Sequence, residues 1–171
     1  YDQAIKDYSE AIRLKPGDAV AWSNRGDAYG NKGEYDQAIK DYSEAIKLDP
    51  GYVKAWYGRG IAYFYKDNYD LAIKYYSEAL KLKPGLTDAW INRGVAYGKK
   101  GEYDQAIKDY SVAIKLKPGL VDAWINRGNA YFDKGDYDQA IKDYSEAIRL
   151  DPSLAIAWIN RRQAYRLKGE Y

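Results

Sequence analysis

An Ala-Trp pair returns along this chain at a fixed interval of 34 residues. All five tryptophans share this phase, at Trp22, Trp56, Trp90, Trp124 and Trp158. A period of this length is typical of an array of small supersecondary units, each of which buries its apolar face against the next. Such an array offers a long surface for holding a partner rather than a single catalytic pocket.

The composition excludes several classes of function. The 171 residues contain no histidine and no cysteine, so soft metal sites and histidine-based acid–base pairs are absent. We therefore expect no enzyme and no cofactor or metal. The net charge of only +2 gives no reason to expect nucleic acid or an anionic membrane as a partner. Because no apolar run approaches the roughly 20 residues of a membrane span, we expect a soluble, cytoplasmic protein.

Residues 19–52 show what one unit encodes. Apolar residues recur at helical spacing in the first half, and Gly33 is expected to end that helix. Asp36 falls in the first turn of a second helix, where a carboxylate complements the helix dipole. Pro50 stops the second helix. The unit is thus helix, turn, helix, stop, and its second apolar face consists of Ala38, Ile39, Tyr42, Ala45, Ile46 and Leu48.

These residues resemble the tetratricopeptide repeat, with its spaced Trp, Gly, Tyr, Ala and Pro, and the pattern recurs in phase throughout the chain. The resemblance implies an all-α, right-handed superhelical solenoid of antiparallel helix pairs. It divides a single array, 1–171, into a half repeat (second helix) at 1–18, full repeats at 19–52, 53–86, 87–120 and 121–154, and a half repeat (first helix) at 155–171.

Two positions depart from the family pattern. The seventh position usually holds leucine, but here it holds Arg25, Arg59, Arg93, Arg127 and Arg161. Aspartates in phase with one another stand at Asp7, Asp41, Asp109 and Asp143, so each arginine is expected to pair with one of these carboxylates. Tyr75 interrupts the aspartate column, and Arg59 is therefore expected to turn to Asp41. The small eighth residue becomes Arg162 in the last unit, which indicates that this position has no close helix neighbour.

The tyrosines are mostly framework residues by the same argument, since 16 of the 20 fall into three phases of the repeat. The four that do not are Tyr52, Tyr57, Tyr65 and Tyr75, and all belong to one repeat and its leading edge.

By the family resemblance, the first helix of each repeat lines a concave groove. Positions that vary between repeats there are candidates for binding a peptide, although contact with the neighbouring first helix would also explain apolar residues. The candidate groove residues are Asn24, Tyr57, Ile91, Asn92, Val95, Ile125, Asn126, Asn129, Phe132, Ile159 and Asn160.

Four of these form an asparagine column, Asn24, Asn92, Asn126 and Asn160, which Gly58 interrupts. An asparagine amide both donates and accepts, so it can hold a peptide backbone whatever its side chains. The column resembles the asparagine ladder in the repeat domain of O-linked N-acetylglucosamine transferases, but asparagine is also common at this position without a ligand. The carboxylate clamp of chaperone adaptors is not assembled, because the matching positions hold Ser, Tyr or Ile.

The two half repeats suggest a piece of a longer array, either duplicated or designed to a consensus. They also suggest head-to-tail self-association, because apolar residues at each end are expected to lack a partner. These residues are Ala4, Ile5, Tyr8 and Ile12 at one end and Trp158, Ala164 and Tyr165 at the other.

The sequence therefore predicts a scaffold or adaptor that binds a peptide or partner protein in the groove. The alternatives are a self-assembling structural array and the substrate-recruiting arm of a larger enzyme.

Overall fold

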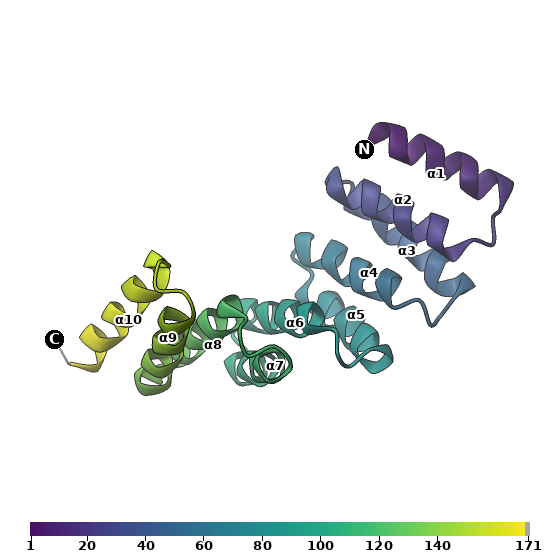
Figure 1. The fold of residues 1–171 in the computed structure, drawn as a ribbon. Coiled ribbons are helices and arrows are strands. Elements are labelled where there is room, and N and C mark those ends of the chain that lie inside the picture. Colours follow the sequence, from purple (N-terminus) through teal and green to yellow (C-terminus); the bar gives the residue numbers. More distant parts are fainter. Residues whose placement is uncertain (170–171) are drawn as a thin grey trace. The chain divides into compact units, whose positions relative to one another are not determined.

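The computed structural model describes residues 1–169 and contains ten α-helices in this range and no strand (Figure 1). In chain order they are α1 (Asp2–Leu14), α2 (Ala19–Asn31), α3 (Tyr35–Leu48), α4 (Val53–Tyr65), α5 (Tyr69–Leu82), α6 (Thr87–Lys99), α7 (Tyr103–Leu116), α8 (Val121–Lys134), α9 (Tyr137–Leu150) and α10 (Ala155–Lys168). The predicted all-α class of antiparallel helix pairs is confirmed.

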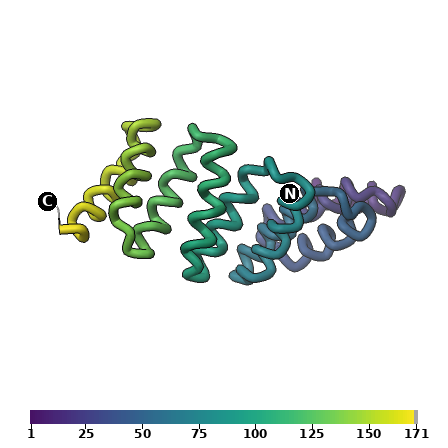
Figure 2. Tube along the Cα trace, turned by 90° about the horizontal axis from the view of Figure 1, so that it is seen from below, coloured from purple at the N-terminus to yellow at the C-terminus, as the bar shows by residue number. Residues whose placement is uncertain are grey.

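Contacts divide the chain into two units, Tyr1–Ala89 and Trp90–Tyr171. In the N-terminal unit α2 packs on α1, α3 and α4, and α4 packs on α5. In the C-terminal unit α8 packs on α7 and α9, and α10 packs on both α9 and α8. The antiparallel course of the helices in this second unit can be followed in Figure 2. The single array over 1–171 stays a prediction.

Direct contacts join α2 with α4 in one unit and α8 with α10 in the other. The first helices of neighbouring repeats therefore lie side by side and form one face of each unit. We call this the first-helix face.

The ends of each helix follow from local chemistry. Asp18 caps α2 by accepting hydrogen bonds from the backbone N–H groups of Val20 and Ala21. Gly33 follows this helix with φ +80°, in the left-handed region that glycine enters without strain, as predicted. Asp36 lies in the first turn of α3, and α3 ends at Leu48 before Pro50, also as predicted.

The tryptophan and proline of each repeat recur together because they are hydrogen-bonded. The indole Nε1 of Trp22 donates to the backbone carbonyl of Pro16 at 2.9 Å. The same bond joins Trp56 to Pro50, Trp124 to Pro118 and Trp158 to Pro152. Each bond holds the loop between repeats against the first helix that follows it and gives the indole N–H an acceptor.

A second recurring contact sets the separation within each helix pair. A Cβ added at the eighth-position glycine would lie only 2.6–2.9 Å from a tyrosine ring of the next helix. The pairs are Gly26 with Tyr42, Gly60 with Tyr76, Gly94 with Tyr110 and Gly128 with Tyr144. Arg162 of α10 occupies the same position and is exposed, which agrees with the expectation that no helix lies close to it.

The core is built mainly from alanines and the second-helix apolar face. Ala38, Tyr42, Ala45 and Ile46 are buried as predicted, and they pack with Ala55 and Ala62 of α4. Leu48 differs from the prediction because it is 42% exposed, at the last residue of α3.

The arginine column pairs with the aspartate column in three repeats. Nε and Nη2 of Arg25 donate to the two carboxylate oxygens of Asp41, at 2.7 and 2.8 Å. Arg93 with Asp109 and Arg127 with Asp143 form the same fork. A third donor, Nη1, reaches a serine of the preceding second helix, as from Arg25 to Ser9 and from Arg127 to Ser111. These groups link three consecutive helices through one partly buried guanidinium.

The prediction that Arg59 pairs with Asp41 is wrong. Both carboxylate oxygens of Asp41 already accept from Arg25. The guanidinium of Arg59 lies instead over the ring of Tyr75, with Cζ 4.2 Å from the ring centroid. The physical reason is that the tyrosine face offers a cation a nearer partner than the carboxylate of the preceding repeat.

Lysine–aspartate pairs 30 residues apart tie each repeat to the next at the surface. Lys32 lies 2.7 Å from Asp2, and Lys134 lies 2.7 Å from Asp104. Lys66 with Asp36 and Lys168 with Asp138 form equivalent pairs. The hydrogen bond and charge of the lysine lower the pKa of Asp2, Asp104 and Asp138.

Candidate functional site

The asparagine column lies on the first-helix face, and two of its members bond to groove neighbours. Asn24 Oδ1 accepts a hydrogen bond from Nζ of Lys54 at 2.9 Å. Asn160 Nδ2 donates to Oδ1 of Asn129 at 3.0 Å. These two amides are therefore oriented by hydrogen bonds to side chains of the neighbouring first helix. Asn92 and Asn126 are half-buried on α6 and α8.

The apolar candidates separate into packed and open residues. Ile125 is 8% exposed and belongs to a core cluster with Ala147, Ile148 and Ala157, so it has little surface to offer a ligand. Ile159, at the same position one repeat later, is 59% exposed. Contact with the neighbouring first helix thus accounts for Ile125, whereas Ile159 lies on α10, the last described helix.

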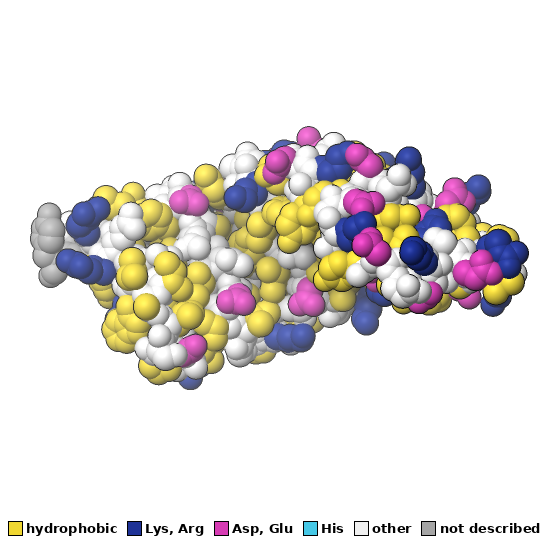
Figure 3. All heavy atoms as spheres, turned by 90° about the horizontal axis from the view of Figure 1, so that it is seen from above, with side chains coloured by type: hydrophobic (Ala, Val, Ile, Leu, Met, Phe, Trp, Pro, Cys, Tyr) yellow, Lys and Arg dark blue, Asp and Glu magenta, His cyan; other side chains and the backbone are white. Residues whose placement is uncertain are grey.

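The remaining apolar candidates are half-buried against their own second helix. Ile91 and Val95 pack on the cluster of Ala106, Tyr110 and Ala130. Phe132 packs on Ala140, Ile141, Tyr144 and Ala164, with its ring 5.4 Å from that of Tyr137. Hydrophobic and uncharged side chains cover much of the C-terminal unit in the view of Figure 3, with basic side chains at its far end.

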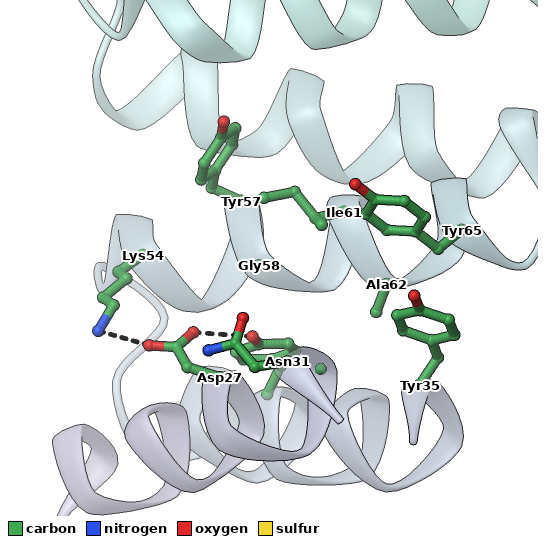
Figure 4. A pocket seen from close by; sticks show the side chains of 11 residues that line it. Asp27, Asn31, Tyr35, Lys54, Tyr57, Gly58, Ile61, Ala62 and Tyr65 are labelled. Atoms are coloured by element: carbon green, nitrogen blue, oxygen red, sulfur yellow. Dashed lines mark hydrogen bonds and ion pairs between the residues drawn. The ribbon is translucent and has the colours of Figure 1, made fainter. Parts of the chain in front are cut away.

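A pocket of about 330 Å³ opens on the first-helix face of the N-terminal unit. Its lining comes from α2 and α3 on one side and α4 on the other, as Figure 4 shows. The lining residues are Asp27, Gly30, Asn31, Tyr35, Tyr42, Lys54, Tyr57, Gly58, Ile61, Ala62 and Tyr65. Of the predicted groove residues, the structure brings Tyr57 into this pocket.

An ion pair closes one end of the pocket. Lys54 Nζ lies 2.7 Å from Oδ2 of Asp27, while Oδ1 of Asp27 accepts from the hydroxyl of Tyr42 at 2.8 Å. Burial and the charge of Asp27 raise the pKa of Tyr42, so this hydroxyl keeps its proton and remains a donor. The carboxylate is thereby held on both oxygens.

Aromatic rings form the other end of this pocket and one of its walls. Tyr35 and Tyr65 stack with ring centroids 5.3 Å apart and planes at 5°. Tyr57 packs on Tyr76 with centroids 5.8 Å apart. Burial and the nearby charge of Asp88 raise the pKa of Tyr57 to about 12.

The equivalent place in the C-terminal unit holds a smaller and more polar pocket. Its volume is about 190 Å³, and its lining residues are Asn129, Phe132, Asp133, Tyr144, Asn160 and Gln163. Tyr144 donates to Oδ1 of Asn129 at 2.8 Å, as Tyr42 does to Asp27. The same backbone scaffold therefore carries two pockets of different chemistry.

Sequence reasoning missed the roles of Asp27, Lys54 and Tyr65. A signal was present, because Tyr57 and Tyr65 are two of the four tyrosines that fall outside the three repeated phases. Tyr75, which also falls outside the three phases, is buried against Tyr63 and does not line the pocket.

The residues proposed for self-association differ in exposure. The prediction that Ile12 and Ala164 lack a partner is wrong, because they are 7% and 0% exposed. Ile12 lies on α1, which packs on α2, while Ala164 belongs to a cluster with Tyr144. Trp158 and Tyr165 are 46% and 36% exposed, and Ala4, Ile5 and Tyr8 are half-buried.

Residues 1–169 contain neither a cluster of metal-ligating side chains nor a helix suited to span a membrane. No group of three or more His, Cys, Asp or Glu residues in this range could hold a metal ion. Within the same range, no helix combines the length and apolar character needed to cross a membrane.

Comparison with known proteins agrees with this architecture. Matches to the tetratricopeptide repeat family cover residues 23–87 and 121–154, and a further match to the TPR repeat covers 1–33 and 99–135. The chain belongs to the tetratricopeptide repeat family. No curated protein matches this TPR chain.

Solved structures also resemble the TPR chain. A crystal structure of MamA is 30% identical, with a TM-score of 0.85 over 90% of both chains. MamA from Desulfovibrio magneticus RS-1 is 22% identical, with a TM-score of 0.84 over 90% of this chain and 86% of that one. TTC0263, a thermophilic TPR protein of Thermus thermophilus, is 19% identical, with a TM-score of 0.71 over 97% and 91%. The last two show the fold alone.

Proposed function

We propose that this TPR chain holds a peptide or partner protein on the first-helix face. The observation that carries the proposal is a contrast within the repeat. Residues that stack the helices are repeated and buried, such as Ala38, Ala72, Ala106 and Ala140, each 0% exposed. Residues at one first-helix position differ in chemistry from repeat to repeat, as Ser23, Tyr57 and Ile91 do. A scaffold with a variable face suits recognition of one particular partner.

The asparagine column supplies the backbone contacts in this proposal. An extended peptide advances about 3.3 Å per residue, and neighbouring helices lie about 8–10 Å apart. Along Asn92, Asn126 and Asn160, where the column is unbroken, one amide would therefore meet about every third peptide residue.

Display selection from a random peptide library tests the proposal. Peptides selected on the wild-type chain should lose affinity for a variant with Asn92, Asn126 and Asn160 changed to alanine. A matched control changes Lys108 and Lys142, which are exposed on the second helices α7 and α9, to alanine. Equal binding to all three proteins, with unchanged circular dichroism, would contradict a role for the column.

Head-to-tail self-association is the second candidate, and two charged residues favour it. Nη1 of Arg161 donates to Ser145 at 3.0 Å, as its equivalents do, but no described aspartate completes its fork. Asp7 is the aspartate of the same column on α1, and it is exposed. A second copy stacked in register would bring these two charges together.

Arg162 argues against this stacking. At the four equivalent glycines a Cβ would lie 2.6–2.9 Å from the following tyrosine ring. Tyr8 of a second copy, docked in the same register, would therefore meet the side chain of Arg162. Groove binding remains our primary proposal for this reason.

A further inference from the structure

The pocket between α2 and α4 deepens the proposed function, on which this inference rests. It exists because two glycines stand where other repeats carry larger side chains. Gly30 lines its floor, whereas Phe64 and Phe132 occupy the same position in other repeats. Gly58 replaces the asparagine of the column, and a Cβ there would lie 2.6 Å from the ring of Tyr42.

The comparison with the equivalent pocket shows what these glycines achieve. Where Phe132 and Asn160 are present, the space shrinks to about 190 Å³ and is lined by amide and carboxylate groups. Where Gly30 and Gly58 are present, it widens to about 330 Å³ and is lined by tyrosine rings. The size is at the lower end for ligand sites and suits one large side chain rather than a cofactor.

The lining favours an aromatic side chain. Tyr57 and Ile61 on the α4 side and the stacked rings of Tyr35 and Tyr65 surround the space in Figure 4. Aromatic pairs gain from edge and offset contacts beyond the burial of area. The one carboxylate in the lining, Asp27, is already bound to Lys54 and Tyr42 and makes no demand for a charged ligand.

We propose that this pocket binds an aromatic side chain of an extended peptide segment. The aromatic ring enters between Tyr57 and the Tyr35–Tyr65 stack.

A pair of matched glycine variants tests the pocket. Gly30→Phe fills it with the ring that Phe132 places at the equivalent position, and a Cβ at Gly30 meets only ordinary contacts at 3.9 and 4.0 Å. Gly98→Phe introduces the same ring at the same repeat position of α6, where a Cβ meets nothing within 4 Å. Both variants are expected to fold, because phenylalanine is a better helix former than glycine.

The experiment measures peptides from a random display library that were selected on the wild-type chain. We expect them to share an aromatic residue. Their affinity should fall about tenfold or more on Gly30→Phe, because the anchor residue of an interface carries much of the binding energy. It should be unchanged on Gly98→Phe.

Two outcomes would overturn the inference in distinguishable ways. Binding of an aromatic side chain in the pocket would be refuted if the selected peptides bind the first-helix face but keep their affinity for Gly30→Phe, or if they carry aliphatic or acidic motifs. The proposed groove function would still stand in that case. If no peptide is selected on the wild-type chain, both proposals fail.

Discussion

The guanidinium of Arg59 lies over the ring of Tyr75, where the other repeats place an aspartate beside their arginine. Tyr75 is itself stacked on Tyr63, with ring centroids 5.3 Å apart. Nε of Arg59 is buried and has no hydrogen-bond acceptor, while Nε of Arg25 lies 2.7 Å from Asp41. One substitution in the repeat has thus replaced a charged fork by a cation–π contact.

Restoring a carboxylate at this position should restore the fork. We expect Tyr75→Asp to have a free energy of unfolding about 1.5–3 kcal/mol above that of Tyr75→Asn, the typical contribution of a hydrogen bond to a charged group. The asparagine variant loses the same ring and differs only in charge. Urea unfolding of the two variants measures the difference, and equal midpoints would show that Arg59 does not reach the new carboxylate.

Removing a carboxylate from an intact fork should have the opposite effect. Asp41→Asn leaves the guanidinium of Arg25, whose side chain is 17% exposed, without its charged partner. We expect a loss of about 2–3 kcal/mol, somewhat below the cost for a fully buried pair. Asp36→Asn, which breaks the exposed pair with Lys66, serves as control and should cost under about 0.5 kcal/mol. A similar loss in both variants would mean that burial of the fork is unimportant.

The turn after α4 contains a strained residue. Asp67 has φ +56°, whereas the matching residues of other repeats are glycines, as Gly33 and Gly101 are. Asp67→Gly should raise the free energy of unfolding by about 0.5–1 kcal/mol, because glycine adopts this conformation without a steric penalty. Asp67→Ala should fall below Asp67→Gly by about 1 kcal/mol. Thermal unfolding of the wild-type chain, Asp67→Gly and Asp67→Ala gives their order of stability. An alanine variant as stable as the glycine variant would exclude backbone strain at this residue.

Stability should fall in alkaline solution partly because of Tyr57. Its pKa is raised to about 12 in the folded chain, by burial and by the charge of Asp88, from about 10 in an unfolded chain. Between these values the folded state binds more protons than the unfolded state, so the free energy of unfolding decreases as pH rises. The contribution is fully present below a pH of about 10 and is lost toward a pH of about 12.

Tyr57→Phe removes this dependence. The drop in unfolding free energy between about pH 9 and about pH 11 should be smaller for the variant than for the wild-type chain. The other buried tyrosines titrate in both proteins, so the difference between the two drops isolates Tyr57. Equal drops would show that its hydroxyl is not protected from ionisation.

Arg162 should act as a block to stacking of copies. Light scattering on the 19.6 kDa wild-type chain should give the monomer mass throughout a dilution series. Arg162→Gly, which restores the glycine of the other repeats, should give a mass that rises with concentration. A wild-type mass that already rises would favour self-association, and a variant that stays monomeric would show that Arg162 is not what prevents it.

Much of the fold could be predicted from the repeat itself. The tryptophan period, Gly33, Asp36 and Pro50 specify helix, turn, helix and stop, because each acts within a few residues of its own position. Pairing of the arginine and aspartate columns was also predictable, since an unpaired guanidinium in a helix interface would be costly. Where the repeat is uniform, one correct interpretation of a unit applies to all.

The pocket could be predicted only in part. Tyr57 and Tyr65 were visible as departures from the pattern, but nothing local indicated that Gly30, Asp27 and Lys54 would meet them. These residues lie on different helices, and their separation depends on how closely α2 and α4 pack. The same is true of Arg59, whose choice of Tyr75 over Asp41 depended on distances between helices.

The sequence by itself thus determined the helices, their order and the residues that stack them, because those follow from periodicity and from local backbone preferences. Only the tertiary structure decided which departures from the repeat form a site. A pocket is a property of the space between elements, and that space is set by side chains that are far apart in the chain, as Gly30 and Tyr65 are.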